Sequence, residues 1–171
     1  MSFVSLLDEG KIKEAKLALR NTVLSQDERK NIWKKILDRN SDTQLDTETL
    51  FWETVDTCYG TRDLIRDTSR LPGCVDTSHC HVYTLSAEDQ GRVTRVVTVM
   101  AYNCPDIPYI PLVYPVSALL LMSGMSEEET YFYITSMVAP CHNINYFTQT
   151  KGGWDILCFS LKPLAQKYIV S

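Results

Sequence analysis

The 171-residue sequence predicts an all-α fold, and three observations carry that prediction. Apolar residues recur at steps of three and four along most of the chain, as they do on one face of a helix. Three serine–acid pairs of the capping-box type stand before apolar runs: Ser25 with Glu28, Ser86 with Asp89, and Ser126 with Glu129. Sustained alternation of apolar and polar residues, which a half-buried strand requires, is missing from the sequence.

The first part of the chain predicts three helices in succession. Leu6 and Leu7 belong to a short helix that Gly10 can end. The next helix carries one apolar stripe, made of Ile12, Ala15, Leu19 and Val23. The third helix opens at Ser25 and is expected to bury Ile32, Trp33, Ile36 and Leu37.

A fourth helix and a long loop follow. Asp46 is a suitable cap for the helix, Gly60 is a suitable stop, and one side carries Phe51, Val55 and Tyr59. Between residues 61 and 85 the helical periodicity fades, and the segment contains Pro72 and Gly73. We therefore expect an ordered loop in this region.

The next segment alternates helices with proline-rich backbone. A helix opened by Ser86 runs through Val93, Val96, Val97 and Met100 and stops before Pro105. Pro108 and Pro111 then favour extended backbone. Pro115 suits the first turn of a buried helix through Ser117, Leu119 and Met122, which Gly124 ends.

Two further helices complete the prediction. Ser126 and Glu129 cap a helix that covers residues 131–138, and a last helix runs from Trp154 to about Ile169, kinked or started by Pro163.

Composition limits the class of protein. Hydrophobic residues make up 44% and charged residues 22% of the chain, as in soluble globular domains. The longest apolar stretch, 116–122, is interrupted by Ser117 and is far shorter than the roughly 20 residues that span a bilayer. The N-terminus lacks the pattern of a secretory signal, which favours a cytosolic location. The net charge of −4 argues against a general nucleic-acid binder.

The six cysteines are scattered, and a cytosolic setting would keep them reduced. Two rival functions use them. A zinc site could draw on Cys74, His79, Cys80 and His81, with Cys141 and His142, although consecutive donors converge poorly on one tetrahedral ion. A thiol or hydrolytic enzyme is the other rival, because a neighbouring histidine lowers a thiol pKa. We expect neither a metal nor a cofactor.

Four motifs, in order, resemble those of TBC domains, the Rab GTPase-activating fold. Arg29-Lys-Asn-Ile-Trp33 fits the R-x-x-x-W motif that opens these domains. The string Asn103-Cys-Pro-Asp-Ile-Pro-Tyr109 resembles the approach to their Y-x-Q motif. Leu119-Leu-Leu-Met followed by Ser126-Glu-Glu-Glu-Thr-Tyr-Phe resembles the next helix pair. The segment from Cys74 to Tyr83 is similar to one in Skywalker-type proteins, which join a TBC domain to a TLDc domain.

This resemblance covers residues 3–170 and implies a partial TBC domain, with the first lobe and the start of the second. The family's domain continues for about a further third, and a shortened second lobe would expose apolar surface. Self-association is therefore expected.

The resemblance also locates two finger positions of GTPase activation. Active TBC proteins use an I-x-x-D-x-x-R motif for an arginine and a Y-x-Q motif for a glutamine. An arginine finger contributes about 10³–10⁵ in rate. Here Asp76 is retained, but His79 stands at the arginine position and Pro111 at the glutamine position. We therefore predict a catalytically degenerate module rather than an enzyme.

The family comparison still implies partners in vesicle and membrane traffic. Asp76, His79 and Tyr109 would line the groove that meets a small GTPase of Rab or Arf type. The structural alternative is that Asp76 caps a turn and Tyr109 packs in the core. Arg29, paired with a carboxylate, and Trp33, as a core anchor, are read as structural.

Skywalker-type domains are also associated with phosphoinositide headgroups. Glu9 stands where one cationic pocket residue is expected, but nearby cations offer a substitute site: Lys11, Lys13, Lys16 and Arg20. A solvated helix face is the alternative. For the chain as a whole, the alternatives are a structural scaffold or regulatory fragment of a longer TBC/TLDc protein, and a residually active GTPase activator.

Overall fold

The computed structural model describes residues 3–20, 22–38, 47–63, 70–138 and 150–168. Its helices are α1 (Phe3–Asp8), α2 (Ile12–Arg20), α3 (Gln26–Asp38), α4 (Thr47–Tyr59), α5 (Ala87–Asn103), α6 (Val113–Met122), α7 (Glu127–Val138) and α8 (Lys151–Tyr168). A 3-10 turn, η1, covers Cys80–Val82. These residues contain no strand, so the predicted all-α fold is confirmed.

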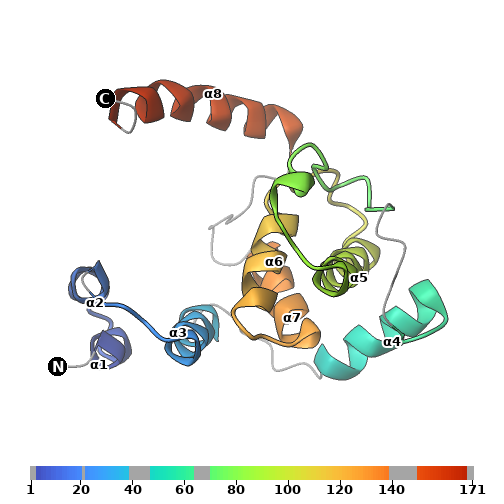
Figure 1. The fold of residues 1–171 in the computed structure, drawn as a ribbon, viewed down its shortest axis with the longest axis horizontal. Helices are drawn as coiled ribbons and strands as arrows, with labels where there is room; N and C mark the ends of the chain where they lie inside the picture. The colour runs from blue at the N-terminus through green and yellow to red at the C-terminus, as the bar shows by residue number, and fades with distance from the viewer. Residues whose placement is uncertain (1–2, 21, 39–46, 64–69, 139–149, 169–171) are drawn as a thin grey trace.

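Helix α5 forms the centre of the main body, with α4, α6 and α7 packed around it (Figure 1). The predicted apolar face of α5 is fully buried, and Val99 on another side of the helix is buried as well. Because these apolar side chains are all removed from water, α5 anchors the core. The buried residues Phe51 and Val55 bring α4 into the same cluster, as predicted.

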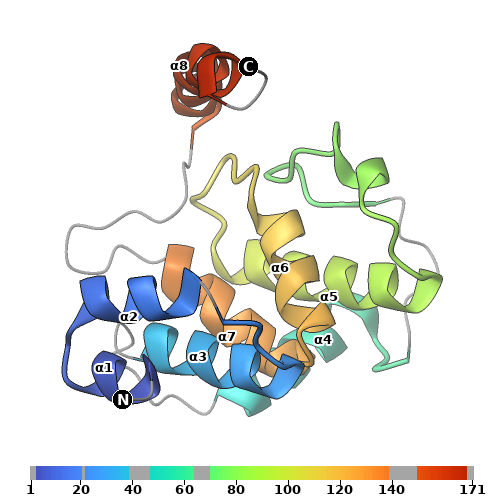
Figure 2. The ribbon, with the colours of Figure 1, turned by 60° about the vertical axis from the view of Figure 1, so that its left-hand side comes forward.

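A second, smaller cluster joins α1, α2 and α3 through Leu6, Leu7, Ala15 and Ile32 (Figure 2). Helix α3 connects this cluster to the main body. Lys30 and Lys34 both pair with Glu129 of α7, and the Lys30 ammonium also donates to the Gly124 carbonyl at 2.9 Å.

The apolar stripe predicted through Val23 is wrong at its end. Helix α2 stops at Arg20, and Val23 is 95% exposed. The Thr22 hydroxyl and amide donate to the carbonyls of Ala18 and Leu19, which closes the last turn before Val23. Ile12 is also mostly exposed. The side chains of Ile36 and Leu37, and the predicted cap Asp46, lie outside the described residues.

The three predicted serine caps are confirmed. The amides of Glu28, Asp89 and Glu129 donate to the hydroxyls of Ser25, Ser86 and Ser126 at 3.3, 3.1 and 3.2 Å. The predicted stops are confirmed as well: Gly60 and Gly124 have φ of 68° and 87°, where a side chain would be strained.

Helix α7 begins at Glu127, earlier than the predicted 131, and α6 and α8 differ from their predictions in part. Helix α6 begins at Val113, so Pro115 lies in its first turn as predicted, but its expected core residues Leu119 and Met122 are 53% and 61% exposed. Ser117 is buried as predicted, beside Ala118, Leu120 and Leu121. Because nearly every residue of α6 is apolar, its sequence has no contrast between apolar and polar positions that would show which face is buried.

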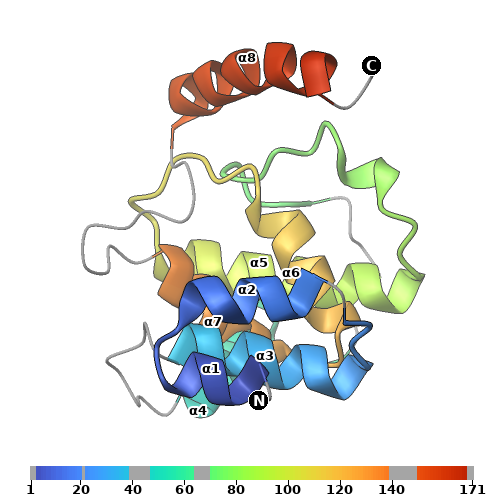
Figure 3. The same ribbon diagram turned by 90° about the vertical axis from the view of Figure 1, so that its left-hand side faces the viewer.

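Helix α8 begins at Lys151, three residues before the predicted start, and Pro163 lies inside it. The Gly153 amide donates to the Thr150 hydroxyl at 3.2 Å, so Thr150 caps the helix. Figures 1 and 3 show α8 standing apart from the other helices. Among the described residues, no helix is long and apolar enough to cross a membrane.

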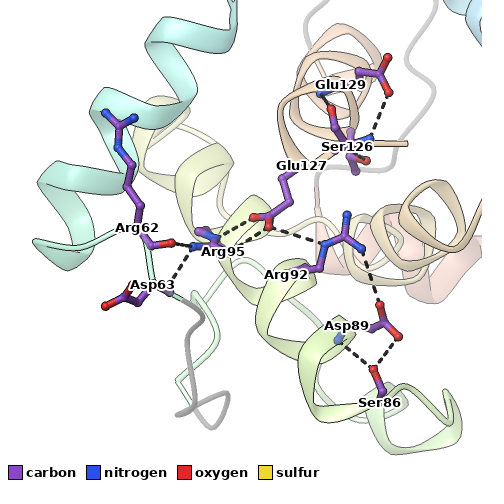
Figure 4. A network of polar contacts seen from close by, with 10 residues as sticks. Arg62, Asp63, Ser86, Asp89, Arg92, Arg95, Ser126, Glu127 and Glu129 are labelled. Carbon is purple, nitrogen blue, oxygen red and sulfur yellow. Dashed lines mark hydrogen bonds and ion pairs between the residues drawn. The ribbon is translucent and has the colours of Figure 1, made fainter. Parts of the chain in front are cut away.

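A buried ion pair links α5 to α7, and the sequence gives no sign of it (Figure 4). The Arg95 guanidinium donates from Nε and Nη2 to the two carboxylate oxygens of Glu127, at 2.7 and 2.9 Å. Arg95 Nη1 also donates to the carbonyls of Arg62 and Asp63. Both charged side chains are more than 90% buried, so the pair fixes where α4 ends against α5 and α7.

Candidate functional site

The loop between α4 and α5 is ordered through the residues that the structure describes, as predicted. Cys74 and Val75 are buried in the main core. The Val75 amide donates to the Pro72 carbonyl at 3.0 Å, and the Cys74 carbonyl accepts from the Ile110 amide at 2.6 Å. This last bond holds the 70–85 loop against the proline-rich segment before α6, which brings two predicted site segments together.

Asp76 and Tyr109 meet across these two segments. The Tyr109 hydroxyl donates to Asp76 Oδ2 at 2.9 Å, and the Ser78 amide donates to Asp76 Oδ1 at 3.0 Å. Bonds from Ser78, and then from Tyr109, hold the pKa of the Asp76 carboxyl below its ordinary value. Burial, and then the bond to Asp76, raises the pKa of Tyr109 to about 12.

Of the structural alternative, the part concerning Asp76 is confirmed and the part concerning Tyr109 is not. Asp76 does close a turn, since an Asp side chain that accepts from the amide two residues on is an Asx-turn. Tyr109 is half-buried but is not among the residues that pack on the main core cluster. Sequence reasoning missed the role of Ser78, although the Asp-x-Ser order is a recognisable turn signal.

His79 lies next to this pair at the start of η1. Its carbonyl accepts from the Val82 amide at 3.0 Å, and its ring lies edge-on to Tyr83 at 5.7 Å between ring centroids. The Nδ1 atom of His79 is enclosed and has no hydrogen-bond partner within the described structure. Pro111 is buried two residues after Tyr109. His79 as a whole residue is half-buried.

The four cations expected to replace a phosphoinositide pocket are not equivalent. Lys11 pairs with Glu9 at 2.7 Å, just before α2. Lys13, Lys16 and Arg20 are exposed, and their steps of three and four place them on the side of α2 away from buried Ala15. Helix α2 thus presents three cations to solvent on one face.

Trp33 takes the expected position and Arg29 does not. Trp33 is half-buried and packs against the main core, as predicted. Arg29 is exposed and forms no ion pair with a described carboxylate. Instead, Arg29 and Trp33 line a groove of about 410 Å³ between α3 and α6, together with the exposed Leu119 and Met122. The sequence did not predict this groove, because Leu119 and Met122 were assigned to the buried face of α6.

The cysteines do not assemble an active thiol site in the described part of the chain. Burial raises the pKa of the Cys74, Cys80 and Cys104 thiols, so each remains protonated and weakly nucleophilic near neutral pH. Among the described residues, no three metal-binding side chains come together. Cys141 and His142 lie outside the described residues.

Comparisons with known proteins agree with the fold. No family model matches the sequence. The chain is 30% identical over 168 residues to the GTPase-activating protein Skywalker of Drosophila melanogaster, covering 97% of this chain and 28% of that protein. It is 29% identical over 100 residues to TBC1 domain family member 24 of Xenopus laevis, covering 57% of this chain and 18% of that protein.

Solved structures give the same result. The crystal structure of the TBC domain of Skywalker/TBC1D24 from Drosophila melanogaster matches 97% of this chain with a TM-score of 0.79 and 30% identity. The same domain in complex with inositol(1,4,5)triphosphate matches with a TM-score of 0.75. This chain spans 54% and 56% of the two solved chains. The chain is therefore a homologue of the Skywalker/TBC1D24 proteins, and it has the all-α fold of their TBC domain.

Proposed function

We propose that residues 3–170 form part of a TBC domain that binds a small GTPase of Rab or Arf type in vesicle traffic, without appreciably accelerating GTP hydrolysis. A small-GTPase partner is supported by the relatives, since Skywalker is named a GTPase-activating protein. The expected binding surface is the joined loop pair that carries Asp76, His79 and Tyr109.

The lack of activation follows from the two finger positions. Phosphoryl transfer requires positive charge on the departing phosphate and a group that orients the attacking water. Arginine supplies a long, permanently charged fork, whereas His79 is short and packs against Tyr83. Pro111 has no side-chain amide and no backbone N–H, and it is buried.

One observation carries the binding proposal. Two residues 33 positions apart are joined by the Tyr109–Asp76 hydrogen bond, and neither side chain belongs to the main core cluster. A carboxylate held by two donors is a preorganised acceptor, and preorganisation lowers the entropy lost on binding. We infer that this pair recognises a cationic or amide group on the GTPase.

A hydrolysis assay and a binding assay test the proposal together. Purified chain is mixed with a panel of Rab and Arf GTPases, and GTP hydrolysis is followed alongside pull-down in both nucleotide states. We expect the chain to bind at least one GTPase without accelerating its GTP hydrolysis. The D76A variant should weaken this binding about tenfold or more, which corresponds to about 1.4 kcal/mol. D106A, which removes an exposed aspartate from the same segment as Tyr109, is the matched control.

If the chain strongly accelerates GTP hydrolysis by any one GTPase, the prediction of a catalytically degenerate module is wrong. The alternative of a residually active GTPase activator would then hold. Absence of binding in both states would favour the scaffold alternative, in which this domain serves only as a structural part of a longer protein.

A second proposed function is binding of phosphoinositide headgroups at a membrane surface. It is supported by the solved complex of the Skywalker TBC domain with inositol(1,4,5)triphosphate. In this chain the exposed cations Lys13, Lys16 and Arg20 on α2 offer the charge that phosphate groups require. The Glu9 carboxylate forms an ion pair with Lys11, which reduces its repulsion of phosphate groups.

Vesicle flotation tests this second function. The chain is expected to float with vesicles that contain a phosphorylated inositol lipid, and the triple variant K13A/K16A/R20A should remain in solution. The triple variant R70A/K151A/K162A changes the net charge equally at other exposed positions and should float as before. Equal losses in both variants would show attraction by net charge alone, and would refute a site on α2.

A further inference from the structure

Helix α2 turns to solvent a face that combines cations with exposed apolar side chains. Helical geometry places Lys13, Lys16 and Arg20 within an arc of about 60°. Ile12 lies beyond one end of this arc and Leu17 beyond the other, each by about 40°. Ile12 and Leu17 are 53% and 61% exposed, and neither belongs to the small cluster of α1, α2 and α3. Single exposed apolar residues are ordinary on a protein surface, but their place on both sides of one row of cations indicates a binding face.

The cations of this face are free to meet an external anion. None of the three forms an ion pair with a described residue, and the nearby carboxylates have other partners: Asp8 pairs with Lys35 at 2.8 Å, and Glu9 with Lys11 at 2.7 Å. Glu14, the only acid in α2, lies about 130° around the helix from the middle of the cation row. The exposed face of α2 is therefore positive.

Val23 adds a third apolar side chain just beyond the end of α2, and it is 95% exposed. The Thr22 hydroxyl and amide donate to the carbonyls of Ala18 and Leu19, which ends the helical path before Val23. Leu24, the next residue, packs on the small cluster. Because Leu24 faces the cluster and Val23 does not, the link between α2 and α3 presents the apolar surface of Val23 to the outside.

This arrangement fits an anionic bilayer better than a groove on a protein. A helix that binds in a protein groove presents one continuous apolar stripe, whereas here the cations separate Ile12 from Leu17. At a bilayer surface, cations remain at the level of the phosphates while neighbouring apolar side chains reach the acyl chains beneath. Figure 3 shows α2 in front of the main body, on the outside of the described chain, where a flat surface can reach it.

We propose that α2 docks flat on an anionic bilayer, with Leu17 and Val23 inserted among the upper acyl chains and the three cations at the phosphates. This docking rests on the second proposed function, and it makes the bilayer, rather than a free inositol phosphate, the ligand of the face. Its two contributions respond differently to salt. Each cation at an anionic surface strengthens binding about fivefold, and salt weakens this effect, whereas burial of apolar surface persists at high salt.

Vesicle flotation of an apolar variant tests the proposal. The vesicles contain phosphatidylcholine, phosphatidylserine and phosphatidylinositol bisphosphate, and calorimetry with soluble inositol trisphosphate measures headgroup binding separately. L17S combined with V23S should weaken vesicle binding about tenfold or more, while the affinity for soluble inositol trisphosphate should be unchanged. L50S combined with V82S removes exposed apolar side chains from α4 and η1 and should float like the unchanged chain.

Quenching by brominated acyl chains locates the inserted side chain. The added indole of V23W should lose fluorescence on vesicles that contain brominated phosphatidylcholine, whereas the added indole of L50W should not. Each signal is measured as the difference from the unchanged chain, which contains three tryptophans of its own.

The outcomes separate the docking of α2 from the second proposed function. If L17S/V23S floats like the unchanged chain, or if V23W is quenched no more than L50W, insertion is wrong while headgroup binding by the cations stands. If the unchanged chain neither floats nor binds inositol trisphosphate, both are wrong. Loss of inositol trisphosphate binding in L17S/V23S would also overturn insertion, because the apolar side chains would then act without a bilayer. Soluble polyglutamate that binds the chain but not L17S/V23S would identify an acidic protein as the partner instead.

Discussion

Replacing the buried Glu127 by alanine should destabilise the protein more than replacing an exposed charged residue of the same helix. The change leaves the Arg95 guanidinium buried at 4% exposure without its carboxylate. Arg95 would retain the carbonyls of Arg62 and Asp63 and the face of Trp52, 5.5 Å from its ring centroid. Neutral carbonyls and a ring do not neutralise a full charge.

The structure sets the magnitude. Both charges are over 90% buried and joined by two hydrogen bonds, which is the case in which loss of one partner costs about 3–5 kcal/mol. For a domain of this size each kcal/mol lowers Tm by about 2–4 °C, so E127A should unfold roughly 10 °C earlier. Urea unfolding of the full chain, followed by far-UV circular dichroism, measures the same difference as a shift in the midpoint.

Two further variants isolate the cause. E128A removes an equivalent charge from the same helix turn and should change the free energy of unfolding by about 1 kcal/mol or less. R95M combined with E127L replaces the pair by apolar groups and should be more stable than E127A, because no charge is left buried. The reasoning fails if E127A matches E128A, or if the double variant is less stable than E127A.

Three other predictions follow from single contacts. In Y109F the pKa of Asp76 should rise towards its ordinary value, while staying below it through Ser78, as carbon-13 NMR titration of the carboxyl would show; an unchanged pKa would mean that the hydrogen bond is absent in solution. Because the folded pKa of Asp76 is lowered and that of Tyr109 is raised to about 12, their contact should stabilise the fold at neutral pH. This stabilisation should be lost as the pH falls through the folded pKa of Asp76, and also as the pH rises from about 10 through about 12. In D76N the Tyr109 phenol should titrate at lower pH, as its absorbance would show. S126A should cost about 1 kcal/mol through loss of the α7 cap, measured by urea unfolding, whereas S123A just before it should cost less.

The parts of the fold that were predictable are those specified by local chemistry. Each capping serine acts through an amide three residues away, and Gly60 and Gly124 act through their own backbone, so short sequence patterns contain the whole interaction. The faces of α5 were predictable because polar residues interrupt its apolar ones. Helix α6 offers no such contrast, and the inward face was assigned to Leu119 and Met122, which lie outside.

Features that depend on distant residues were not predictable. Arg95 and Glu127 are 32 positions apart, and a single sequence does not indicate that two charges among 38 will meet in the interior. The candidate site divides in the same way. The Asx-turn of Asp76 is local and was foreseen as one alternative, while its bond to Tyr109 depends on how the proline-rich segment crosses the loop.

Local and distant features meet at His79 and Pro111, the two positions where the proposal places the missing fingers. A side chain that delivers charge to a phosphate must project from a surface that stays rigid while the GTPase docks. The loop pair supplies the rigid surface through the Ile110–Cys74 and Tyr109–Asp76 hydrogen bonds. At the two proposed finger positions, the Nδ1 atom of His79 is enclosed and Pro111 is buried. A preorganised surface without a projecting cation or amide favours recognition of a GTPase over acceleration of its chemistry.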